Sequence, residues 1–478
     1  MRSIFFLLVC IFFTTSSNGQ EFVSATLKGS RTKAQLISQF SNPLIKNGTK
    51  YYAILYTSLD AKGAKDTLSG LLAVPDDLRF KYPRLIYQHG TSDCKNCVPS
   101  RFGATGGEEG QVGLIGCGLG YITYLPDYVG MGNGRGFQTY VHAATIQRAT
   151  DDFVTATEQW LKDNGVIRND QMFITGYSQG GYSSMAYHKF LEENGQTVTA
   201  AAHLSGPYSM SNVMRDLILG DIAYSFPAYL PNTALGYQEV YGDLYSQLSD
   251  IFKPDFFTDI QLYYNHSISL FELNDRLYAK LTTQFGSSVA KNMIQPDYLA
   301  EVVNNSNARI NQVLLENDVY KWIPKAPTRI FYCTADDQVP FMNSIVAKDY
   351  MLNAGATKLQ AFDVSPNANH GACFNPALTQ TIIFFLGFQQ ITSSNGNIIY
   401  NDLVKVAPNP VMDRVNVSFP GIITGYALYD FVGNEILSED LSAENSIEVD
   451  VQHITSGLYL LRLKMEGNIL VDKKLIKQ

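Results

Sequence analysis

Residues 172–181 read Met-Phe-Ile-Thr-Gly-Tyr-Ser-Gln-Gly-Gly: a short apolar run, a serine between two glycines at the spacing G-x-S-x-G, and then a long amphipathic stretch. This pattern is typical of a sharp strand-to-helix turn that presents a serine hydroxyl as a nucleophile. Gly176 and Gly180 stand where side chains on the strand and the helix would collide. The pattern predicts that Ser178 is a nucleophile. Pentapeptides of this kind are common by chance, so the rest of the sequence must supply its partners.

A carboxylate is expected between the serine and the histidine in the chain order of such a sheet, because the acid fixes the tautomer and charge of the imidazole. The predicted strand 329–333 is followed by Thr-Ala-Asp-Asp-Gln-Val-Pro at 334–340. We assign Asp336 as the acid, with Asp337 as the alternative. The other interpretation is that either aspartate only caps the helix after Pro340.

A histidine that accepts the serine proton is expected last in the chain. The predicted strand 359–364 is followed by Asn-His-Gly at 369–371, which places His370 after the acid, in the terminal loop of the sheet. His203 lies within an apolar strand, where a core histidine with satisfied hydrogen bonds is expected. The other histidines lie at an earlier strand end, on helical patterns or in other regions: His89, His142, His188, His266 and His453.

An oxyanion hole requires two backbone N–H groups that face the charge developing on the carbonyl oxygen. The residue after the nucleophile, Gln179, is expected to supply one. The loop after strand 84–88 reads His-Gly-Thr-Ser at 89–92, and we assign the second N–H to Thr91 because Gly90 lets the backbone approach. The alternative for this loop is an ordinary glycine turn.

Short apolar runs alternate with helical patterns along most of the chain, which predicts an α/β fold with a doubly wound, mostly parallel sheet. Residues 51–60 and 67–74 alternate as a hairpin of two early strands. The remaining strands are predicted at 84–88, 121–125, 172–175, 199–204, 329–333 and 359–364, with helices at 141–163, 180–193, 342–354 and 376–389.

The interval of about 206–326 breaks this alternation, because it has helical periodicity and no apolar strand run. A structureless loop of that length is implausible inside a compact domain. We therefore predict an inserted helical cap over the carboxyl edge of the sheet. Its many Tyr, Phe and Leu residues suit a helical core first, and an apolar substrate channel as well.

The last part of the chain changes to short alternating strands separated by turn residues. Strands are predicted at 404–407, 414–419, 427–431, 446–451 and 458–464. The resulting domain organisation is a signal peptide at 1–20, a catalytic domain at 21–390, a linker at 391–403 and a β-sandwich at 404–478.

The N-terminus carries a positive charge into the apolar run 4–13, followed by small and polar residues, which predicts a secretory signal peptide. That run is too short to span a bilayer, and no later segment is long and apolar enough. The net charge of −8 gives no indication of nucleic-acid binding. The protein is therefore expected to act outside the cytoplasm, with no transmembrane segment in the mature chain.

Five cysteines remain after the signal peptide, and in an oxidising compartment they are better explained by disulfides than by metal ligands. The odd number leaves one unpaired. Cys94 and Cys97 resemble half of a zinc knuckle, but no second pair follows, so no metal is predicted. The glycine clusters 116–120 and 130–136 do not fit a nucleotide-binding motif in register and are interpreted as loop glycines. No cofactor is expected.

Taken together, His89-Gly90, the Pro-Asp-Tyr-Val-Gly-Met-Gly run at 126–132, the serine pentapeptide and the ordered Asp336 and His370 resemble the α/β-hydrolase superfamily. The subgroup that the chain resembles most is the secreted lipases and esterases related to Candida lipase A, which carry a helical cap between nucleophile and acid. The resemblance covers roughly residues 25–390. It implies ester hydrolysis through an acyl-serine intermediate, with a buried acyl tunnel under the cap.

The tail resembles the C-terminal sorting domain of the type IX secretion system of Bacteroidetes. The similarity lies in Val-Ala-Pro-Asn-Pro at 406–410, Leu-Tyr-Asp at 428–430 with Gly433, Ser-Gly-Leu-Tyr at 456–459 and the basic end 473–477. The resemblance implies export across the outer membrane by that machinery, often with removal of the tail. The alternative is a carbohydrate-binding or spacer sandwich.

These observations predict a secreted or cell-surface serine hydrolase that cleaves a small-molecule or lipid-like carboxylic ester with the triad Ser178, His370 and Asp336. A peptidase of the prolyl-oligopeptidase type shares this sheet and triad order and is the enzymatic alternative. A cell-surface binding protein on a degenerate hydrolase scaffold is the non-enzymatic alternative, and the presence of all three triad members argues against it.

Overall fold

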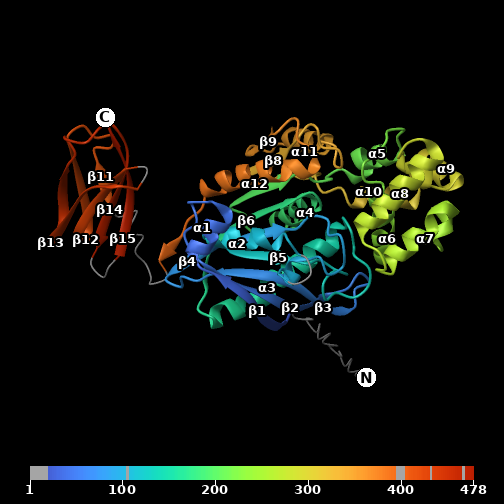
Figure 1. The fold of residues 1–478 in the computed structure, drawn as a ribbon, viewed down its shortest axis with the longest axis horizontal. Helices are drawn as coiled ribbons and strands as arrows, with labels where there is room; N and C mark the ends of the chain where they lie inside the picture. Colours follow the sequence, from blue (N-terminus) through green and yellow to red (C-terminus); the bar gives the residue numbers. More distant parts are fainter. Residues whose placement is uncertain (1–19, 104–106, 394–403, 431–432, 466–468) are drawn as a thin grey trace, which may run out of the picture. The chain divides into compact units, whose positions relative to one another are not determined.

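The computed structural model describes residues 20–103, 107–393, 404–430, 433–465 and 469–478 (Figure 1). The chain forms two compact units, which divide between Ile391 and Thr392. Only Gln20 of the predicted signal peptide and residues 391–393 of the predicted linker lie within the described residues.

The first unit is built on one mixed sheet with the spatial strand order β1-β2-β3-β5-β4-β6-β7-β8-β9. The pairs from β1 to β5 are antiparallel, and the pairs from β5 through β9 are parallel. The predicted doubly wound, mostly parallel sheet is confirmed. The strands are β1 (Phe22–Arg31), β2 (Thr49–Leu59), β3 (Lys65–Pro75), β4 (Phe80–Gln88), β5 (Ile122–Pro126), β6 (Ile167–Tyr177), β7 (Ala200–Leu204), β8 (Thr328–Tyr332) and β9 (Leu359–Asp363).

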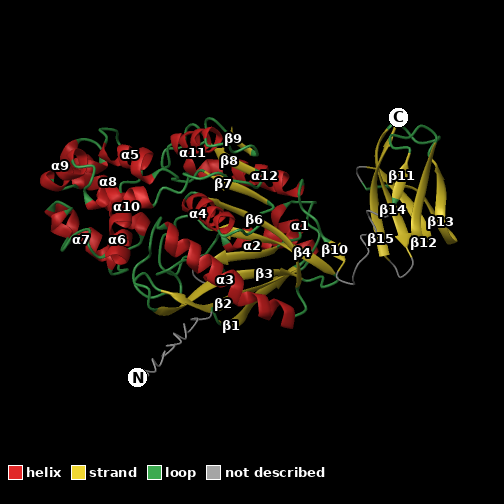
Figure 2. Cartoon of the chain, turned by 180° about the vertical axis from the view of Figure 1, so that it is seen from behind, coloured by secondary structure: helices red, strands yellow, loops and turns green. Residues whose placement is uncertain are grey.

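Helices cover both faces of this sheet, as Figure 2 shows. One face packs against α3 (Ala143–Asp163), α4 (Gln179–Glu193) and α11 (Met342–Asn353), and the other against α1 (Lys33–Phe40), α2 (Gly110–Gly118) and α12 (His370–Leu386). Because both faces are covered, the central strands have apolar residues on both sides, and every residue of β7 is buried. None of the helices in the described ranges is long and apolar enough to span a membrane.

The interval between β7 and β8 folds into helices, as its periodicity predicted (Figure 1). Its apolar side chains form one continuous core with residues of α4, β8 and α11. This insertion is called the cap below. It comprises a short π-helical turn (Met210–Met214), α5 (Arg215–Leu219), α6 (Tyr229–Tyr241), α7 (Pro254–Tyr264), α8 (Leu270–Phe285), α9 (Pro296–Asn304) and α10 (Arg309–Glu316), with 3-10 turns at Leu248–Asp250 and Ala290–Met293.

The glycine cluster 116–120 was predicted as a loop, and this prediction is wrong for its first half. Gly116 and Gly118 belong to the last turns of α2. A Cβ atom on Gly116 would lie 2.8 Å from the Thr123 hydroxyl oxygen and 2.9 Å from a Leu85 methyl carbon. Glycine is needed there because the helix packs closely against the sheet, which a pattern search for loops does not detect.

The second unit is a set of antiparallel strands around its own apolar core, as predicted for the C-terminal domain. The prediction divided residues 414–431 into two strands, whereas the structure has one long strand, because a register shift between Ser418 and Ile423 accommodates Pro420 and Gly421. The strands of its sheet are β11 (Lys405–Ala407), β12 (Arg414–Asp430), β13 (Glu435–Asp450), β14 (Gly457–Met465) and β15 (Ile469–Lys477).

Candidate active site

Ser178 lies between the end of β6 and the start of α4, where the chain reverses sharply. Its backbone has φ 60° and ψ −121°, which are unusual for a residue other than glycine. The Ser178 N–H donates to the carbonyl oxygen of Leu204 at 2.9 Å, so the neighbouring strand β7 holds the turn. Strained backbone of this kind is typical of functional positions, because the surrounding structure must impose it.

The two glycines of the pentapeptide are required by backbone contacts. A Cβ atom on Gly180 would lie 2.0 Å from the carbonyl oxygen of Gln88. A Cβ atom on Gly176 would lie 2.4 Å from the carbonyl oxygen of Gly180. Both clashes would be with main-chain atoms, which cannot move away as a flexible side chain can by changing its rotamer. The steric role that the sequence predicted for both glycines therefore agrees with the structure.

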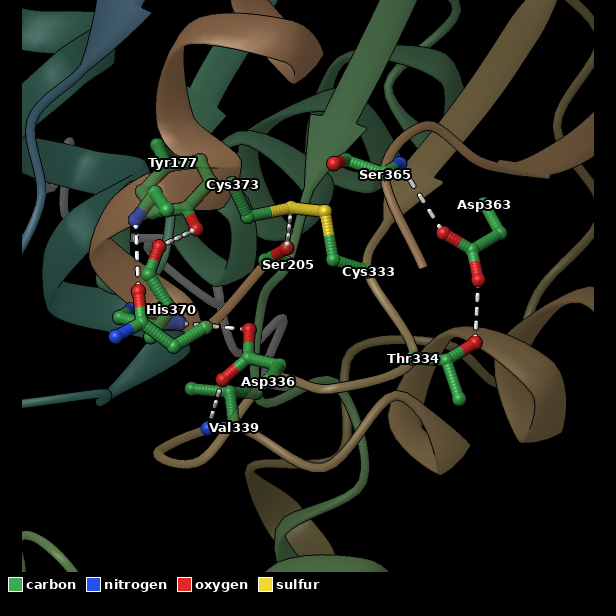
Figure 3. Close-up of a disulfide and its surroundings, with 12 residues drawn as sticks. Tyr177, Ser205, Cys333, Thr334, Asp336, Val339, Asp363, Ser365, His370 and Cys373 are labelled. Atoms are coloured by element: carbon green, nitrogen blue, oxygen red, sulfur yellow. Dashed lines mark hydrogen bonds and ion pairs between the residues drawn. A yellow bond between two sulfur atoms is a disulfide. The ribbon is translucent and has the colours of Figure 1, made fainter. Parts of the chain in front are cut away.

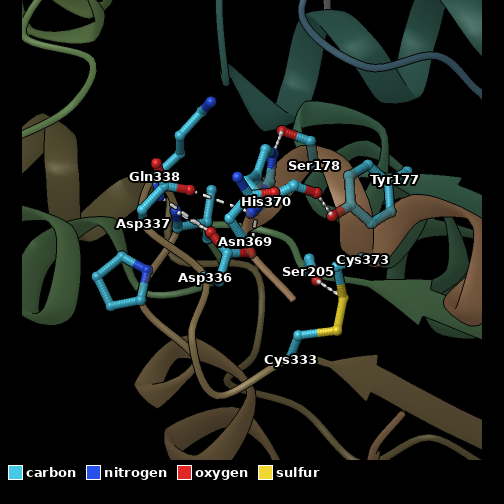
Figure 4. Close-up of polar contacts among 12 residues, drawn as sticks. Tyr177, Ser178, Ser205, Cys333, Asp336, Asp337, Gln338, Asn369, His370 and Cys373 are labelled. Carbon is cyan, nitrogen blue, oxygen red and sulfur yellow. Dashed lines mark hydrogen bonds and ion pairs between the residues drawn. A yellow bond between two sulfur atoms is a disulfide. The ribbon is translucent and has the colours of Figure 1, made fainter. Parts of the chain in front are cut away.

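The structure brings Ser178, His370 and Asp336 into one hydrogen-bonded chain (Figure 4). The Nε2 atom of His370 lies 2.8 Å from Ser178 Oγ, and its Nδ1 atom lies 2.7 Å from Asp336 Oδ2. The side chains of His370 and Asp336 are 8% and 1% exposed, so water competes little for either bond. An ionised carboxylate only accepts hydrogen bonds, so the imidazole proton belongs on Nδ1 and leaves Nε2 free to accept from the serine.

The two neighbouring aspartates have different partners, which the sequence could not distinguish. Asp336 faces the imidazole, and its other oxygen accepts the N–H groups of Gln338 and Val339 at 3.0 and 2.8 Å. Asp337 instead accepts the backbone N–H of His370 at 3.1 Å. One carboxylate therefore contacts the ring of His370 and the other contacts its main chain.

His370 is the first residue of α12, so the prediction of a loop at this residue and of a helix that begins at residue 376 is wrong. The Asn369 side chain caps the helix by accepting the N–H of Ala372 at 3.0 Å. Pro376 lies within the helix and does not start it. The side-chain cap moves the start of the helix forward, so His370 is held by regular structure.

Two further contacts, which no sequence pattern indicated, hold the histidine and the acid (Figure 3). A disulfide joins Cys333, directly after β8, to Cys373 in the first turn of α12. The Tyr177 hydroxyl donates to the carbonyl oxygen of His370, and burial raises the pKa of this tyrosine, which keeps the donor protonated. Cys94 and Cys97 form a second disulfide, and Cys117 is free and buried.

The N–H groups of Gln179 and Thr91 donate to no acceptor within the described part of the chain. Gln179 begins α4, where the unpaired N–H groups and the helix dipole favour negative charge. Thr91 lies in the loop after β4, which Glu109 holds by accepting the Gly90 N–H at 2.9 Å and the Tyr87 hydroxyl at 2.7 Å. Glu109 was not singled out in the sequence, because it lies 19 positions from Gly90.

Tyrosines of the cap contact the loop that carries the acid. The hydroxyl groups of Tyr224 and Tyr229 donate to the backbone and side-chain oxygens of Gln338 at 2.7 and 2.9 Å. Burial raises the pKa of both tyrosines, so both hydroxyls remain donors. Tyr229 also lines an apolar cavity of about 100 Å³ within the cap. Its other walls include Met210, Met214, Leu230, Ile251 and Leu314.

Among the described residues, no group of three or more His, Cys, Asp or Glu side chains is arranged to hold a metal ion. His203 has the expected satisfied core environment, because its ring nitrogens contact Ser184 and His188. His142, predicted within a helix, caps the start of α3 instead. The chemistry that these arrangements allow is proton transfer along Ser178, His370 and Asp336 at the start of α4, where the Gln179 N–H is unpaired among the described residues.

Two family models match parts of the chain. Residues 405–478 match the secretion system C-terminal sorting domain. Residues 114–225, which include Ser178, match the prolyl oligopeptidase family. No functionally curated protein matches the sequence.

Several solved structures have the fold of the first unit. A presumed hydrolase from Legionella pneumophila has 23% identity and a TM-score of 0.69, with 77% of this chain and 98% of that chain covered. The rice cell wall degrading esterase LipA from Xanthomonas oryzae has 22% identity and a TM-score of 0.65, with 77% and 96% covered. Candida antarctica lipase A in its closed state has 13% identity and a TM-score of 0.56, with 77% and 81% covered. The first unit therefore has the α/β-hydrolase fold, and residues 405–478 match the secretion system C-terminal sorting domain.

Proposed function

We propose that this protein is a serine hydrolase that cleaves carboxylic esters through an acyl-enzyme intermediate. The observation that carries the proposal is the hydrogen-bonded chain of Ser178, His370 and Asp336, at a strained turn that begins a helix. This arrangement has the order and roles of a catalytic triad: nucleophile, base and orienting acid. The fold by itself would not support the proposal, since one fold hosts many functions.

In the first half of the reaction, His370 Nε2 takes the proton of Ser178 as Oγ attacks the ester carbonyl carbon. Asp336 stabilises the imidazolium that forms without becoming protonated itself. The same Nε2–H then protonates the departing alcohol oxygen, which leaves the acyl group on Ser178. In the second half, His370 activates a water molecule that releases the acid and restores the serine.

The negative charge on the carbonyl oxygen needs donors that are already in place before the reaction. The Gln179 and Thr91 N–H groups are proposed for this role because neither donates elsewhere in the described structure. Glu109 supports the second donor by fixing the amide of the preceding Gly90. Preorganised donors of this kind contribute roughly 10²- to 10³-fold each to kcat in serine hydrolases.

The acyl group is proposed to enter the cap cavity that Tyr229 lines. This cavity is lined almost entirely by hydrocarbon and aromatic side chains, which suit an alkyl chain. An apolar cavity of roughly 150 Å³ takes up benzene. A volume of about 100 Å³ therefore favours a short acyl chain. Esterase and lipase structures of the same fold are consistent with this substrate class.

A prolyl-oligopeptidase-like peptidase is the second candidate, because residues 114–225 match that family. Purified protein should be assayed on p-nitrophenyl esters from acetate to laurate and, in parallel, on prolyl p-nitroanilides. We expect the highest kcat/KM on short-chain esters. Higher kcat/KM on the anilides would favour the peptidase.

Labelling by a fluorophosphonate tests whether the protein is an enzyme of this class at all. We expect the wild-type protein to be labelled on Ser178 and the variant Ser178→Ala to remain unlabelled. If the folded wild-type protein is not labelled, a non-catalytic binding protein on a hydrolase scaffold becomes the better explanation.

Export is proposed to depend on the C-terminal unit, because residues 405–478 match the sorting domain and the N-terminus has the pattern of a signal peptide. A variant lacking residues 404–478 should keep its esterase activity but remain inside the cell. Normal secretion of that variant, with loss of activity, would contradict the proposal. The proposal thus assigns catalysis to the first unit of the chain and export to the C-terminal unit.

A further inference from the structure

The Cys333–Cys373 disulfide joins the two segments that supply the acid and the base. Cys333 follows the last residue of β8, and the loop that it begins carries Asp336 (Figure 3). Cys373 lies in α12, which begins with His370. The two cysteines are separated by 40 positions in the sequence, and their Cα atoms lie 6.0 Å apart. The bond thus closes a ring that contains both catalytic side chains.

The path from the disulfide to each catalytic side chain is short and regular. Asp336 follows Cys333 by three positions, and its N–H donates to the Cys333 carbonyl oxygen at 3.2 Å. Cys373 follows His370 by three positions, about one helical turn, and its N–H donates to the Asn369 carbonyl oxygen at 2.9 Å. A displacement of either sulfur should therefore move Asp336 or His370 as well, because only a short hydrogen-bonded segment separates each cysteine from the catalytic residue.

The disulfide is also fixed by its surroundings. Both cysteines are fully buried, in an apolar cluster with Tyr177, Leu204 and Phe331. The Ser205 hydroxyl lies 3.7 Å from the Cys373 sulfur, and the Ser205 N–H donates to the Phe331 carbonyl oxygen at 2.9 Å. The carboxyl ends of β7 and β8 therefore hold the bond against the sheet.

The other contacts of these segments tie them mainly to different neighbours. The loop 333–341, which carries Asp336 and is called the acid loop, is held to the segment around β9 by two hydrogen bonds. The Thr334 hydroxyl donates to Asp363, and the Ala335 N–H donates to the Pro366 carbonyl oxygen. The start of α12 is held to β6 through Tyr177. The hydrogen bonds that link the acid loop to α12 come from His370 itself, to Asp336 and Asp337. Without the disulfide, these two hydrogen bonds and the apolar packing of α12 against β7 and β8 would have to hold the acid and the base together.

We propose that Cys333 and Cys373 are positioning residues of the triad, whose disulfide sets the contact between Asp336 and His370. The inference rests on the proposed serine hydrolase function. Reactive geometries tolerate little displacement, and a misplacement of about 1 Å can cost roughly 100-fold in rate. Loss of the bond should lower kcat more than it raises KM, because the substrate pocket is formed by other residues.

The test compares wild-type protein with the double variant Cys333→Ala/Cys373→Ala, measured with p-nitrophenyl acetate well below the melting temperature. We expect kcat to fall by roughly 10- to 100-fold with KM nearly unchanged. A looser Asp336 contact stabilises the imidazolium less, so the acidic limb of the pH profile of kcat/KM should move to lower pH. Circular dichroism confirms that the assayed protein is folded.

The matched control is Cys94→Ala/Cys97→Ala, which removes a disulfide of three-position separation that joins no part of the triad. It should change kcat by less than about threefold and leave the pH profile in place. A folded Cys333→Ala/Cys373→Ala variant with wild-type kcat and pH profile would overturn the proposal. So would a loss of kcat explained entirely by a smaller folded fraction, with an unshifted profile.

If the alanine pair does not fold, the pair Cys333→Ser/Cys373→Ser is assayed in the same way. Failure of both pairs to fold would overturn the proposal, because the bond would then be required for folding and not for placement. Fluorophosphonate labelling of Ser178 in the oxidised wild-type protein separates this inference from the proposed function. A labelled wild type with an unaffected double variant refutes the disulfide role alone, whereas an unlabelled, inactive wild type refutes both.

Discussion

Two hydrogen-bonded chains, each of serine, histidine and an acid, begin close together in the sequence. One begins at Ser178, in the turn before α4, and the other at Ser184, within α4. The first runs from Ser178 through His370 to Asp336. In the second, Ser184 Oγ lies 2.8 Å from His203 Nδ1, His203 Nε2 lies 3.2 Å from His188 Nδ1, and His188 Nε2 lies 3.1 Å from Glu192 Oε1. Residue types and distances are similar in the two chains, so these alone do not make a catalytic site.

The difference lies in the backbone around each serine. Ser178 stands at a strained turn beside the unpaired N–H groups that begin α4. Ser184 lies within α4, where its hydroxyl also contacts the Gly181 carbonyl oxygen at 2.8 Å and neighbouring amides belong to the helix. Ser184, His188 and His203 are fully buried. A substrate carbonyl could meet neither the Ser184 hydroxyl nor an oxyanion hole there.

The second chain has a structural role that its contacts explain. Glu192 accepts the N–H groups of Lys325 and Ala326 at 2.7 and 2.8 Å, where the chain returns from the cap and enters β8. The Trp322 ring packs edge-on against His188, with centroids 4.8 Å apart. The buried chain thus anchors the segment that leads to the acid loop.

The largest expected effect separates the two serines directly. Ser178→Ala should reduce kcat on p-nitrophenyl esters by about 10⁴-fold or more, because the nucleophile is lost. Ser184→Ala should retain activity within about threefold, because it removes only a core hydrogen bond. Steady-state kinetics on both variants checks this, and equal losses in the two would break the comparison.

The second effect concerns the two aspartates. Asp336→Asn should lower kcat by about 10³- to 10⁴-fold, because the amide cannot stabilise the imidazolium and favours the wrong tautomer. Asp337→Asn should lower kcat by less than about tenfold, because an amide oxygen can still accept the backbone N–H of His370. The reverse ranking in kcat would assign the acid role to Asp337.

The third effect falls on stability and not on catalysis. Glu192→Ala leaves His188 and two backbone N–H groups without their acceptor, which should lower the free energy of unfolding by about 3 kcal/mol. Urea unfolding measures this, and the exposed neighbour Glu193→Ala is the control. The kcat of the folded Glu192→Ala protein should stay within about threefold of wild type, and a loss comparable to that of Ser178→Ala would contradict a purely structural role.

The smallest expected effect is a pH dependence of the free energy of unfolding, caused by the buried His142. Burial, with a smaller effect of Arg148, lowers the pKa of His142 to about 4. The unfolded chain therefore binds a proton that the folded chain does not between about pH 6.5 and 4, so this contribution to stability is lost as the pH falls through that window. From pH 7 to pH 5 the loss should be about 2 kcal/mol.

The variant His142→Asn tests this, because asparagine keeps the helix cap at α3 and does not titrate. Urea unfolding at pH 7 and pH 5 should show a smaller drop for the variant than for the wild type, by about 2 kcal/mol. Equal drops in the two proteins would show that other groups cause the acid sensitivity.

Much of the fold was predictable because its signals are local. Buried strands, the helical interval 206–326 and the strand-turn-helix at Ser178 each depend on residues close together in the chain. The start of α12 was missed because the Asn369 cap overrides the usual preference for proline in a first turn. The long strand β12 was missed because a register shift lets a proline remain within a strand.

The amino-acid sequence by itself determined the serine turn, through the G-x-S-x-G spacing after an apolar run, and the chain order of nucleophile, acid and base. Only the tertiary structure decided that Asp336 and not Asp337 contacts the imidazole ring of His370, that Cys333 pairs with Cys373, and that Ser184 begins a second, buried chain. These outcomes depend on the directions in which side chains from distant segments point. Such directions are set by strand register, helix caps and packing across the sheet, which no local pattern records.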